Sequence, residues 1–347
     1  LNKYECAQVT PANTILGSDK GALGGDSPDT TKGAPDYPLL LKEAQKRCGE
    51  LLWLATRTRP DLCYTVQQMC TRAVGEPSRV IRMARRVYRW LRYSPDVGIL
   101  LPNEAELALR RDAPDAIGCW EHWTERLLTY TDASFAPHIM EVVRDTDEAG
   151  RPMNVDEYGG DVHPEVHNAR SIHAIFVVAQ GPPVWWKTAR QPFVTLSTAE
   201  SELIAQTEGY VAGRSVETFI TEAFSLPGAE MEETQVPLAC DNKAAVQILG
   251  RSGGNGPIAW RTRHLRIRPA RLMEAIDKSK ARIFHCPGGD MGADLGTKTL
   301  PAPVLVRLMR LLCMVSLASV TAGVDADDPS GGGEPPELVG AWTLTEF

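Results

Sequence analysis

The feature that most constrains this chain is a change in its hydrophobic pattern near residue 127. From about residue 37 to 101, apolar residues recur every three or four positions, as on the buried face of a helix. After residue 127, short runs rich in β-branched and aromatic residues alternate with helical segments. Three strands come first, then a long helix, then strands and helices in turn. This order predicts an α/β fold, with a mixed sheet flanked by helices and a small helical segment before it.

The pattern also predicts the domain boundaries. Residues 1–36 are rich in Gly, Asp, Thr and Pro and predict a flexible leader, followed by the helical segment (37–101) and a polar joint (102–126). Residues 127–300 form the α/β domain, with an acidic surface insertion at 138–170. Residues 301–347 are expected to form a C-terminal helix and tail. The apolar run at 311–324 is too short for a confident membrane span, and we expect it to pack as a helix.

Composition and cysteine spacing exclude several classes of protein. The eight cysteines of the 347 residues are scattered and form no C-x-x-C pair, which argues against a disulfide framework or zinc site and favours a reducing compartment. The N-terminus has no apolar signal segment and no initiator Met, which suggests a piece of a longer polyprotein. We expect a cytoplasmic or nuclear protein with no membrane partner that is not secreted. The net charge of −7 means that nucleic-acid binding would need local basic patches.

Three aspartates stand out by their positions. Asp132 follows a strand-forming run, Asp241 closes the run 236–240, and Asp294 lies in a short segment near the end of the domain. Open α/β sheets usually place their chemistry at the carboxyl ends of strands, where the first two would lie. Each aspartate alone is more often a turn or cap residue, so only their joint placement suggests a site.

A glutamate completes the set. The helix that begins near residue 197 offers Glu200 and Glu202, and Ser197 has capping-box spacing to Glu200, which gives Glu200 a structural role. Glu202 points about 200° around the helix from Glu200. It shares a stripe with small residues, including Gly209, that could lie against a sheet. Glu202 is therefore the predicted fourth acid.

Four convergent carboxylates suit phosphodiester hydrolysis. Mg²⁺ prefers hard oxygen ligands, and two such ions about 3.5–4 Å apart can serve both ends of an in-line displacement. Asp132, Glu202, Asp241 and Asp294 are therefore candidates to hold two Mg²⁺ ions, with Mn²⁺ as a substitute, although the pattern alone only suggests such a site.

Two basic segments predict contacts with nucleic acid. Between residues 251 and 282 there are nine Lys or Arg and two acids, and a basic helix is expected at about 261–276. The residues predicted to contact nucleic acid there are Arg261, Arg263, His264, Arg266, Arg268 and Arg271, with Asn242 next to the acids. A helix at 78–93 carries six arginines and no acid. Arg82, Arg86 and Arg89 are its predicted phosphate contacts, with a plain solvated helix as the alternative.

Several motifs, in order, resemble those of copia-type ribonuclease H domains. They are YTDAS (130–134), LSTAESEL (196–203), CDNKAA (240–245) and ADLGTK (293–298), with the link at 186–192 and the basic stretch at 261–268 in their places between them. Upstream, segments 51–61 and 86–91 look like the helical tail of the same elements' reverse transcriptase. The resemblance covers roughly residues 40–300 and is with the C-terminal part of a copia-type retrotransposon Pol polyprotein.

This resemblance implies a ribonuclease H-like fold with a five-stranded mixed sheet, and Mg²⁺-dependent cleavage of the RNA strand of RNA–DNA hybrids. Matched residue by residue, Asp132, Glu202, Asp241 and Asp294 would be the metal ligands. The implied partners are an RNA–DNA hybrid and the palm and fingers of the reverse transcriptase in a longer polyprotein. The implied location is a cytoplasmic virus-like particle or the nucleus.

Three departures from the family leave alternatives open. No polymerase palm is present, so DNA synthesis by this chain alone is not expected. The insertion at 138–170 is longer than the usual link. Gly289 stands where retroviral domains carry a second histidine, and His285 is expected in a strand, so no catalytic histidine is assigned. The alternatives are a decayed or domesticated transposon remnant that binds nucleic acid or a partner, and a structural module serving a polymerase supplied elsewhere.

Overall fold

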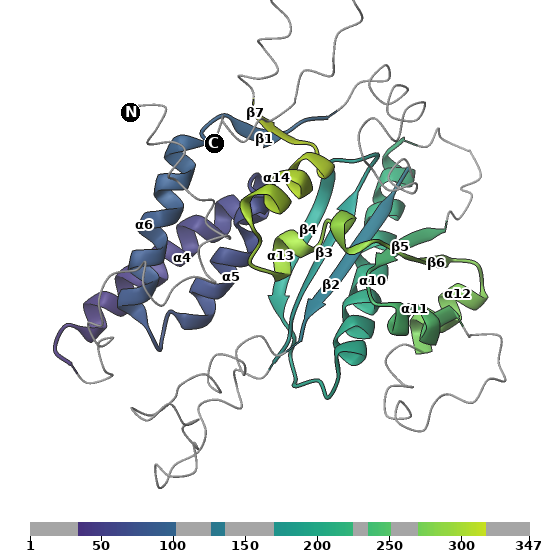
Figure 1. Cartoon of the computed structure of the whole chain (residues 1–347), viewed down its shortest axis with the longest axis horizontal. Helices are drawn as coiled ribbons and strands as arrows, with labels where there is room; N and C mark the ends of the chain where they lie inside the picture. The colour runs from purple at the N-terminus through teal and green to yellow at the C-terminus, as the bar shows by residue number, and fades with distance from the viewer. Residues whose placement is uncertain (1–33, 102–125, 136–169, 225–234, 251–269, 317–347) are drawn as a thin grey trace, which may run out of the picture. The chain divides into compact units, whose positions relative to one another are not determined.

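The computed structural model describes residues 34–101, 126–135, 170–224, 235–250 and 270–316 (Figure 1). The predicted leader, joint, insertion and most of the tail lie outside these ranges. The chain divides into two compact units, each described here by itself. The first comprises residues 1–126, 178–187 and 294–347, and the second comprises residues 127–177 and 188–293.

The first unit is built on a helical segment, as its periodicity predicts. Its elements are α4 (Tyr37–Arg57), the 3-10 turn η1 (Pro60–Leu62), α5 (Cys63–Arg72) and α6 (Pro77–Tyr93). Each begins at or next to a proline or directly continues the turn before it. Prolines suit first turns because the missing N–H would have no helical partner there. The buried stripe of α4 is Ala44, Cys48, Leu51 and Ala55.

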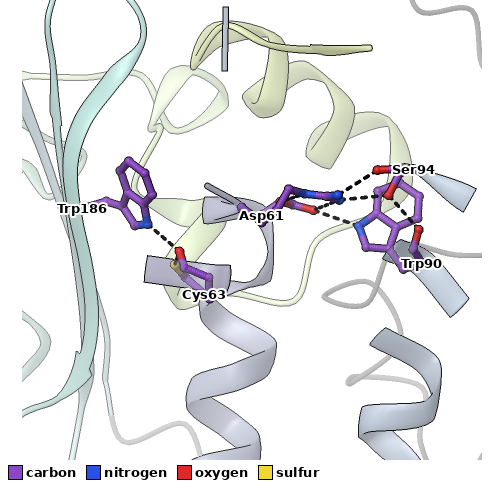
Figure 2. Close-up of polar contacts among 7 residues, drawn as sticks. Asp61, Cys63, Trp90, Ser94 and Trp186 are labelled. Carbon is purple, nitrogen blue, oxygen red and sulfur yellow. Dashed lines mark hydrogen bonds and ion pairs between the residues drawn. The ribbon is translucent and has the colours of Figure 1, made fainter. Parts of the chain in front are cut away.

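A buried polar network fixes the end of α6 in this unit (Figure 2). The Arg59 guanidinium donates to both carboxylate oxygens of Asp61, each at 2.9 Å, and also to the carbonyl and hydroxyl oxygens of Ser94. The indole N–H of Trp90 donates to Asp61 at 2.8 Å. Arg59, Asp61, Trp90 and Ser94 are all at most 5% exposed. The charges are buried but fully paired, the condition under which a buried charge is tolerated.

The same unit contains α13 (Asp294–Thr297), α14 (Ala302–Leu311) and a two-stranded sheet of β1 (Val97–Ile99) and β7 (Met314–Ser316). The prediction of a helix through 311–324 is wrong for residues 314–316, which form β7. Cys313 has a φ of 53° and its N–H bonds to Arg310, so the chain turns out of the helix at that point.

The second unit contains most of the main sheet, which has the order β4-β3-β2-β5-β6. The strands are β2 (Leu128–Ser134), β3 (Ile172–Val178), β4 (Pro183–Arg190), β5 (Val236–Cys240) and β6 (Ala281–His285). Residues 178–187, which end β3 and form most of β4, are counted with the first unit. β5 lies between β2 and β6 and runs parallel to both. A parallel pair needs a crossover connection, and the helices supply it. His285 ends β6, which confirms that it is a strand residue.

A tight hairpin makes the other edge of the sheet antiparallel. Gln180 and Gly181, between β3 and β4, both have positive φ, as a two-residue type I′ turn requires. The Ala179 N–H bonds to the Pro182 carbonyl, and beyond the strands the Gln191 N–H bonds to Ser171. Such a hairpin joins antiparallel neighbours, so the sheet is mixed.

The helices of the second unit are α10 (Thr198–Phe224), α11 (Lys243–Gly250) and α12 (Ala270–Asp277). Figure 1 shows α10 running along the sheet beside β2 and β5. Leu203 and Tyr210 of α10 join Val236 and Leu238 of β5 in the core, and Leu249 and Leu272 join from the shorter helices. Burial of these side chains holds the helices on the sheet.

Two glycines allow α10 to approach the sheet closely. A Cβ at Gly209 would overlap the Thr131 methyl group, and one at Gly213 would lie 2.6 Å from Thr129 Oγ1 and 2.7 Å from Val236 Cγ1. Side chains at three- and four-residue spacing share one face of a helix, so Gly209 and Gly213 continue the face that carries Glu202 and Ala205. The sequence singled out Gly209 but not Gly213.

The predicted architecture is confirmed: a mixed five-stranded sheet with flanking helices, and a helical segment before it. The predicted basic helix at 261–276 overlaps α12, but residues 261–269 lie outside the described ranges. No helix of the described residues is long and apolar enough to cross a membrane.

We expect Gly209→Ala to lower the free energy of unfolding by about 1–3 kcal/mol, because the added methyl group overpacks the contact with β2. Gly49→Ala in α4 is the control, because a Cβ there would meet nothing within 4 Å. It should leave stability unchanged or raise it by about 0.5–1 kcal/mol through helix propensity. Urea unfolding followed by circular dichroism measures both. Equal effects of the two variants would contradict the close approach.

Asp61→Asn should destabilise the first unit by about 3–5 kcal/mol, because it leaves the Arg59 charge buried without its counter-ion. Glu43→Gln removes one of the two part-exposed acids that pair with Arg47 and should shift the thermal midpoint far less. Differential scanning calorimetry of both variants distinguishes the two cases. A comparable shift for Glu43→Gln would mean that the buried network is not a principal stabiliser of this unit.

Candidate metal centre

The predicted acids Asp132 and Asp241 lie on neighbouring strands. Strands β2 and β5 are parallel, with Thr129 opposite Leu238 and Tyr130 opposite Ala239. Two more residues in this register bring Asp132 beside Asp241. Asp241 follows β5, as predicted, whereas Asp132 lies inside β2, which runs on to Ser134. Parallel strands place their carboxyl ends at one edge, and these two acids occupy it.

Three carboxylates meet at this edge. Asp132, Asp241 and Asp294, the first residue of α13, each offer an oxygen, and these oxygens all lie within 4.8 Å of one another. Asp294 follows Ala293, the last residue of the second unit, directly in the chain. Asp132 is 1% exposed and Asp294 is 8% exposed, while Asp241 is half-buried. Three acids this close would repel one another strongly without a cation.

Glu202 lies next to the same position, from the first turns of α10. It is 4% exposed, and ligand atoms of Glu202, Cys240 and Asp241 all lie within 4.8 Å of one another. Asp241 thus belongs to both groups of possible ligands. The structure brings the four predicted acids into two groups that share Asp241, while their assignment as ligands remains a prediction.

The capping interactions explain why Glu202 and not Glu200 lies at this position. The Glu200 N–H donates to Ser197 Oγ at 3.1 Å. The Glu200 carboxylate accepts from the Leu196 N–H at 2.6 Å, one residue before the position expected for a capping box. Glu200 is therefore occupied in starting the helix, and Glu202 is buried on another side.

Cys240 is the residue of this group that was not predicted. Its thiol lies 3.9 Å from Glu202 Oε2. Burial, followed by the negative charge of Glu202, raises the pKa of the Cys240 thiol far above its usual value. The thiol therefore stays protonated at neutral pH. Because the thiolate and not the thiol binds metal ions, the ligand atoms available in this group are the oxygens of Glu202 and Asp241. The sequence did carry a signal for Cys240, because it is a short residue directly before Asp241 at the end of a run that predicts a buried strand.

Two neighbouring side chains support the acids. Lys298, which directly follows α13, places its Nζ 2.6 Å from Asp294 Oδ1 and offsets part of the local negative charge. Asn242 caps α11, because its Oδ1 accepts from the N–H groups of Ala244 and Ala245. This oxygen is thus used within the protein, and only the amide NH₂ of Asn242 remains for the predicted nucleic-acid contact.

The donor set fits a hard divalent cation. Carboxylate oxygens are the ligands that Mg²⁺ prefers, and it commonly binds through a few carboxylates and several waters. The partial exposure of Asp241 leaves one side of the group open to solvent. A cation here would relieve the repulsion among the buried acids. Asp132, Glu202, Asp241 and Asp294 could therefore hold Mg²⁺ or Mn²⁺.

The predicted basic contacts divide into those described and those not. Arg271 is exposed on α12, whereas Arg261, Arg263, His264, Arg266 and Arg268 lie outside the described residues. On α6, Arg89 is exposed, while Arg82 and Arg86 are partly buried. Arg85 and Arg92, which were not chosen from the sequence, are exposed on the same helix.

Comparison with known proteins gives a distant relationship. No protein-family model matches the chain. It is 23% identical over 333 residues to the retrovirus-related Pol polyprotein from transposon TNT 1-94 of Nicotiana tabacum, covering 83% of this chain. The chain spans only 22% of that polyprotein. It is therefore distantly similar to part of a retrotransposon Pol polyprotein.

A solved structure of LC11-RNase H1 in complex with an RNA/DNA hybrid was also matched. The match covers 48% of this chain and 88% of that one, with 11% identity and a TM-score of 0.28. The fold described above rests on strand order and helix placement and not on this likeness.

Mg²⁺ should stabilise the protein by about 1–3 kcal/mol at concentrations well above its dissociation constant, because it binds only the folded arrangement of acids. Asp132→Asn should raise the thermal midpoint without Mg²⁺, since it removes a repelling charge, and should abolish the response to Mg²⁺. Asp277→Asn, an exposed acid on α12, makes the same change in net charge and should keep the response. Differential scanning fluorimetry with and without Mg²⁺ measures this. An equal response in all three proteins would rule out binding at Asp132.

Proposed function

We propose that this chain is a ribonuclease that hydrolyses the RNA strand of RNA–DNA hybrids with Mg²⁺ held by Asp132, Glu202, Asp241 and Asp294. The observation that carries the proposal is the convergence of Asp132, Asp241 and Asp294 at the carboxyl edge of the sheet, with Glu202 adjoining Asp241. The distant similarity to a retrotransposon Pol polyprotein and the ordered motifs around these acids support it.

The four acids have distinct surroundings that suit distinct roles. Asp132 and Glu202 are buried and held by a strand and a helix, so they would fix the position of bound cations. Asp241 is half-buried and common to both ligand groups, so it would face the substrate side. These acids would hold two Mg²⁺ ions, which would supply an activated water and charge stabilisation at the leaving oxygen of a phosphodiester. Lys298 keeps Asp294 in place and limits the net negative charge near an anionic substrate.

Recognition of the hybrid would come from the phosphate backbone. Protein side chains read A-form-like duplexes mainly through shape, phosphates and 2′-hydroxyls. Arg271 on α12 is exposed in the second unit, and the arginines at 261–268 belong to the same basic segment of the sequence. We expect cleavage to depend little on base sequence.

The wider setting is proposed on the same basis. A longer polyprotein would supply the palm and fingers of a reverse transcriptase, and the protein would act in a cytoplasmic virus-like particle or in the nucleus. Mn²⁺ would replace Mg²⁺ because it accepts the same carboxylate ligands.

The test is cleavage of an RNA–DNA hybrid labelled on the RNA strand, in Mg²⁺ and separately in Mn²⁺. The wild type should cut the RNA strand and leave a DNA duplex of the same sequence intact. Asp241→Asn should lower the rate by about 100-fold or more, because it weakens both groups of cation ligands. Asp277→Asn should cut at the wild-type rate.

Folding of each variant is checked by circular dichroism before the assay. A well-folded wild type that cuts no hybrid in either metal would overturn the proposal in favour of a non-catalytic remnant. Cleavage that persists in Asp241→Asn would place the chemistry elsewhere.

A further inference from the structure

One face of α6 carries a row of exposed arginines, Arg85, Arg89 and Arg92, called here the arginine stripe. We propose that the arginine stripe is a second nucleic-acid-binding surface, which grips the phosphate backbone of a duplex. The choice of an RNA–DNA hybrid as that duplex rests on the proposed function. The surface itself lies in the first unit and uses none of the four acids.

The helix geometry places the stripe on the solvent side. The buried face of α6 is formed by Val80, Met83, Ala84, Val87 and Trp90, all at most 3% exposed. At 100° per residue, the three arginines of the stripe fall within an arc of about 60° opposite that face. From Arg85 to Arg92 the stripe extends about 10 Å along the helix axis. Partly buried Arg82 lies at its edge.

The described residues do not neutralise the charge of the stripe. Residues 34–101 contain twelve Lys or Arg and six Asp or Glu, while the whole chain has a net charge of −7. Four of the acids form ion pairs with other arginines: Glu43 and Glu50 with Arg47, Asp61 with Arg59, and Glu76 with Arg79. Within the described residues, the stripe makes no ion pair. No acid occurs between residues 77 and 95.

The helix that carries the stripe is held firmly. Arg59 and Asp61 hold Trp90 and Ser94 at its C-terminal end through buried hydrogen bonds (Figure 2). On the side facing α4, the Tyr88 hydroxyl donates to Glu50 at 2.7 Å. The arginine backbones are therefore fixed before a ligand arrives, which lowers the entropic cost of binding.

The composition of this face favours nucleic acid over an acidic protein. Protein interfaces usually contain an apolar or aromatic centre within a polar rim. The exposed residues of α6 are all arginines, and Ile81, the large apolar residue next to them on the helix surface, is partly buried. Protein–DNA interfaces are far more positively charged, and the planar guanidinium of arginine matches phosphate oxygens in a two-pronged contact.

The experiment measures binding of a fluorescent RNA–DNA hybrid by anisotropy, using the full chain with Asp241→Asn and no divalent cation, so that cleavage does not interfere. The triple variant Arg85→Gln/Arg89→Gln/Arg92→Gln should weaken binding at least about tenfold near 100 mM salt. The slope of log affinity against log salt should fall by about 2–3, because each phosphate contact contributes about 0.9.

The matched control is Lys42→Gln/Lys46→Gln/Arg57→Gln, which removes three exposed charges from α4 in the same unit. It should change affinity less than threefold. Equal losses in both triples would mean general charge attraction and overturn the proposal. Unchanged hybrid binding in the stripe variant, with lost binding of poly-glutamate, would assign the stripe to an acidic protein instead.

Failure of this proposal is separable from failure of the proposed function. With Asp241 intact, the stripe variant should cut saturating hybrid at the wild-type rate and show only a raised KM. A chain that binds hybrid through the stripe but never cuts it would support the binding surface and overturn the proposed ribonuclease activity. A chain that cuts hybrid normally but binds it independently of the stripe would support the ribonuclease activity and overturn the binding surface.

Discussion

The close packing of α10 on β2 is the contact on which the rest of the second unit depends. Gly209 and Gly213 have no side chain at the point where Thr129 and Thr131 of the strand rise towards the helix. A larger residue at either position would push the helix away from the sheet. That movement would displace Glu202, two turns towards the N-terminus on the same helix face, from its place beside Asp241. The helix–sheet distance thus sets the geometry of the acid cluster.

Collecting these carboxylates costs folding free energy, and the structure offsets that cost in identifiable ways. Asp132 and Glu202 are nearly inaccessible to water, where an ionised carboxylate loses hydration. Lys298 offers an opposite charge to Asp294, and Cys240 remains a neutral thiol next to Glu202. What remains is a compact, oxygen-lined negative centre that a divalent cation would neutralise.

The first unit obtains its order differently. Its central charged pair, Arg59 and Asp61, is buried and satisfied by Trp90 and Ser94, so it supports packing and leaves no charge for a ligand. The exposed arginines of α6 are the opposite case, since their charge has no counterpart among the described residues. The buried, paired charge of Arg59 thus serves the structure, whereas the exposed arginines of α6 are available to a partner.

Local chemistry explains why much of the site could be predicted. The run before Asp241 has the composition of a buried strand, and the spacing of Ser197 to Glu200 predicted that Glu200 takes part in starting the helix. Less local features were missed. Strands β1 and β7 have three residues each and pair across more than two hundred residues of sequence, so neither has a pattern of its own. Exposure of Arg85 rather than Arg86 depends on which side α6 packs, and the proximity of Cys240 to Glu202 depends on the helix–sheet distance.

The most direct test of the central claim is to locate a bound cation. Crystals of the protein grown with Mn²⁺ should show anomalous scattering peaks among the carboxylates of Asp132, Glu202, Asp241 and Asp294. Crystals of Asp241→Asn grown in the same way should lose or weaken these peaks. Ordered carboxylates without any peak at saturating Mn²⁺, or peaks only elsewhere on the molecule, would contradict a metal centre at this edge of the sheet.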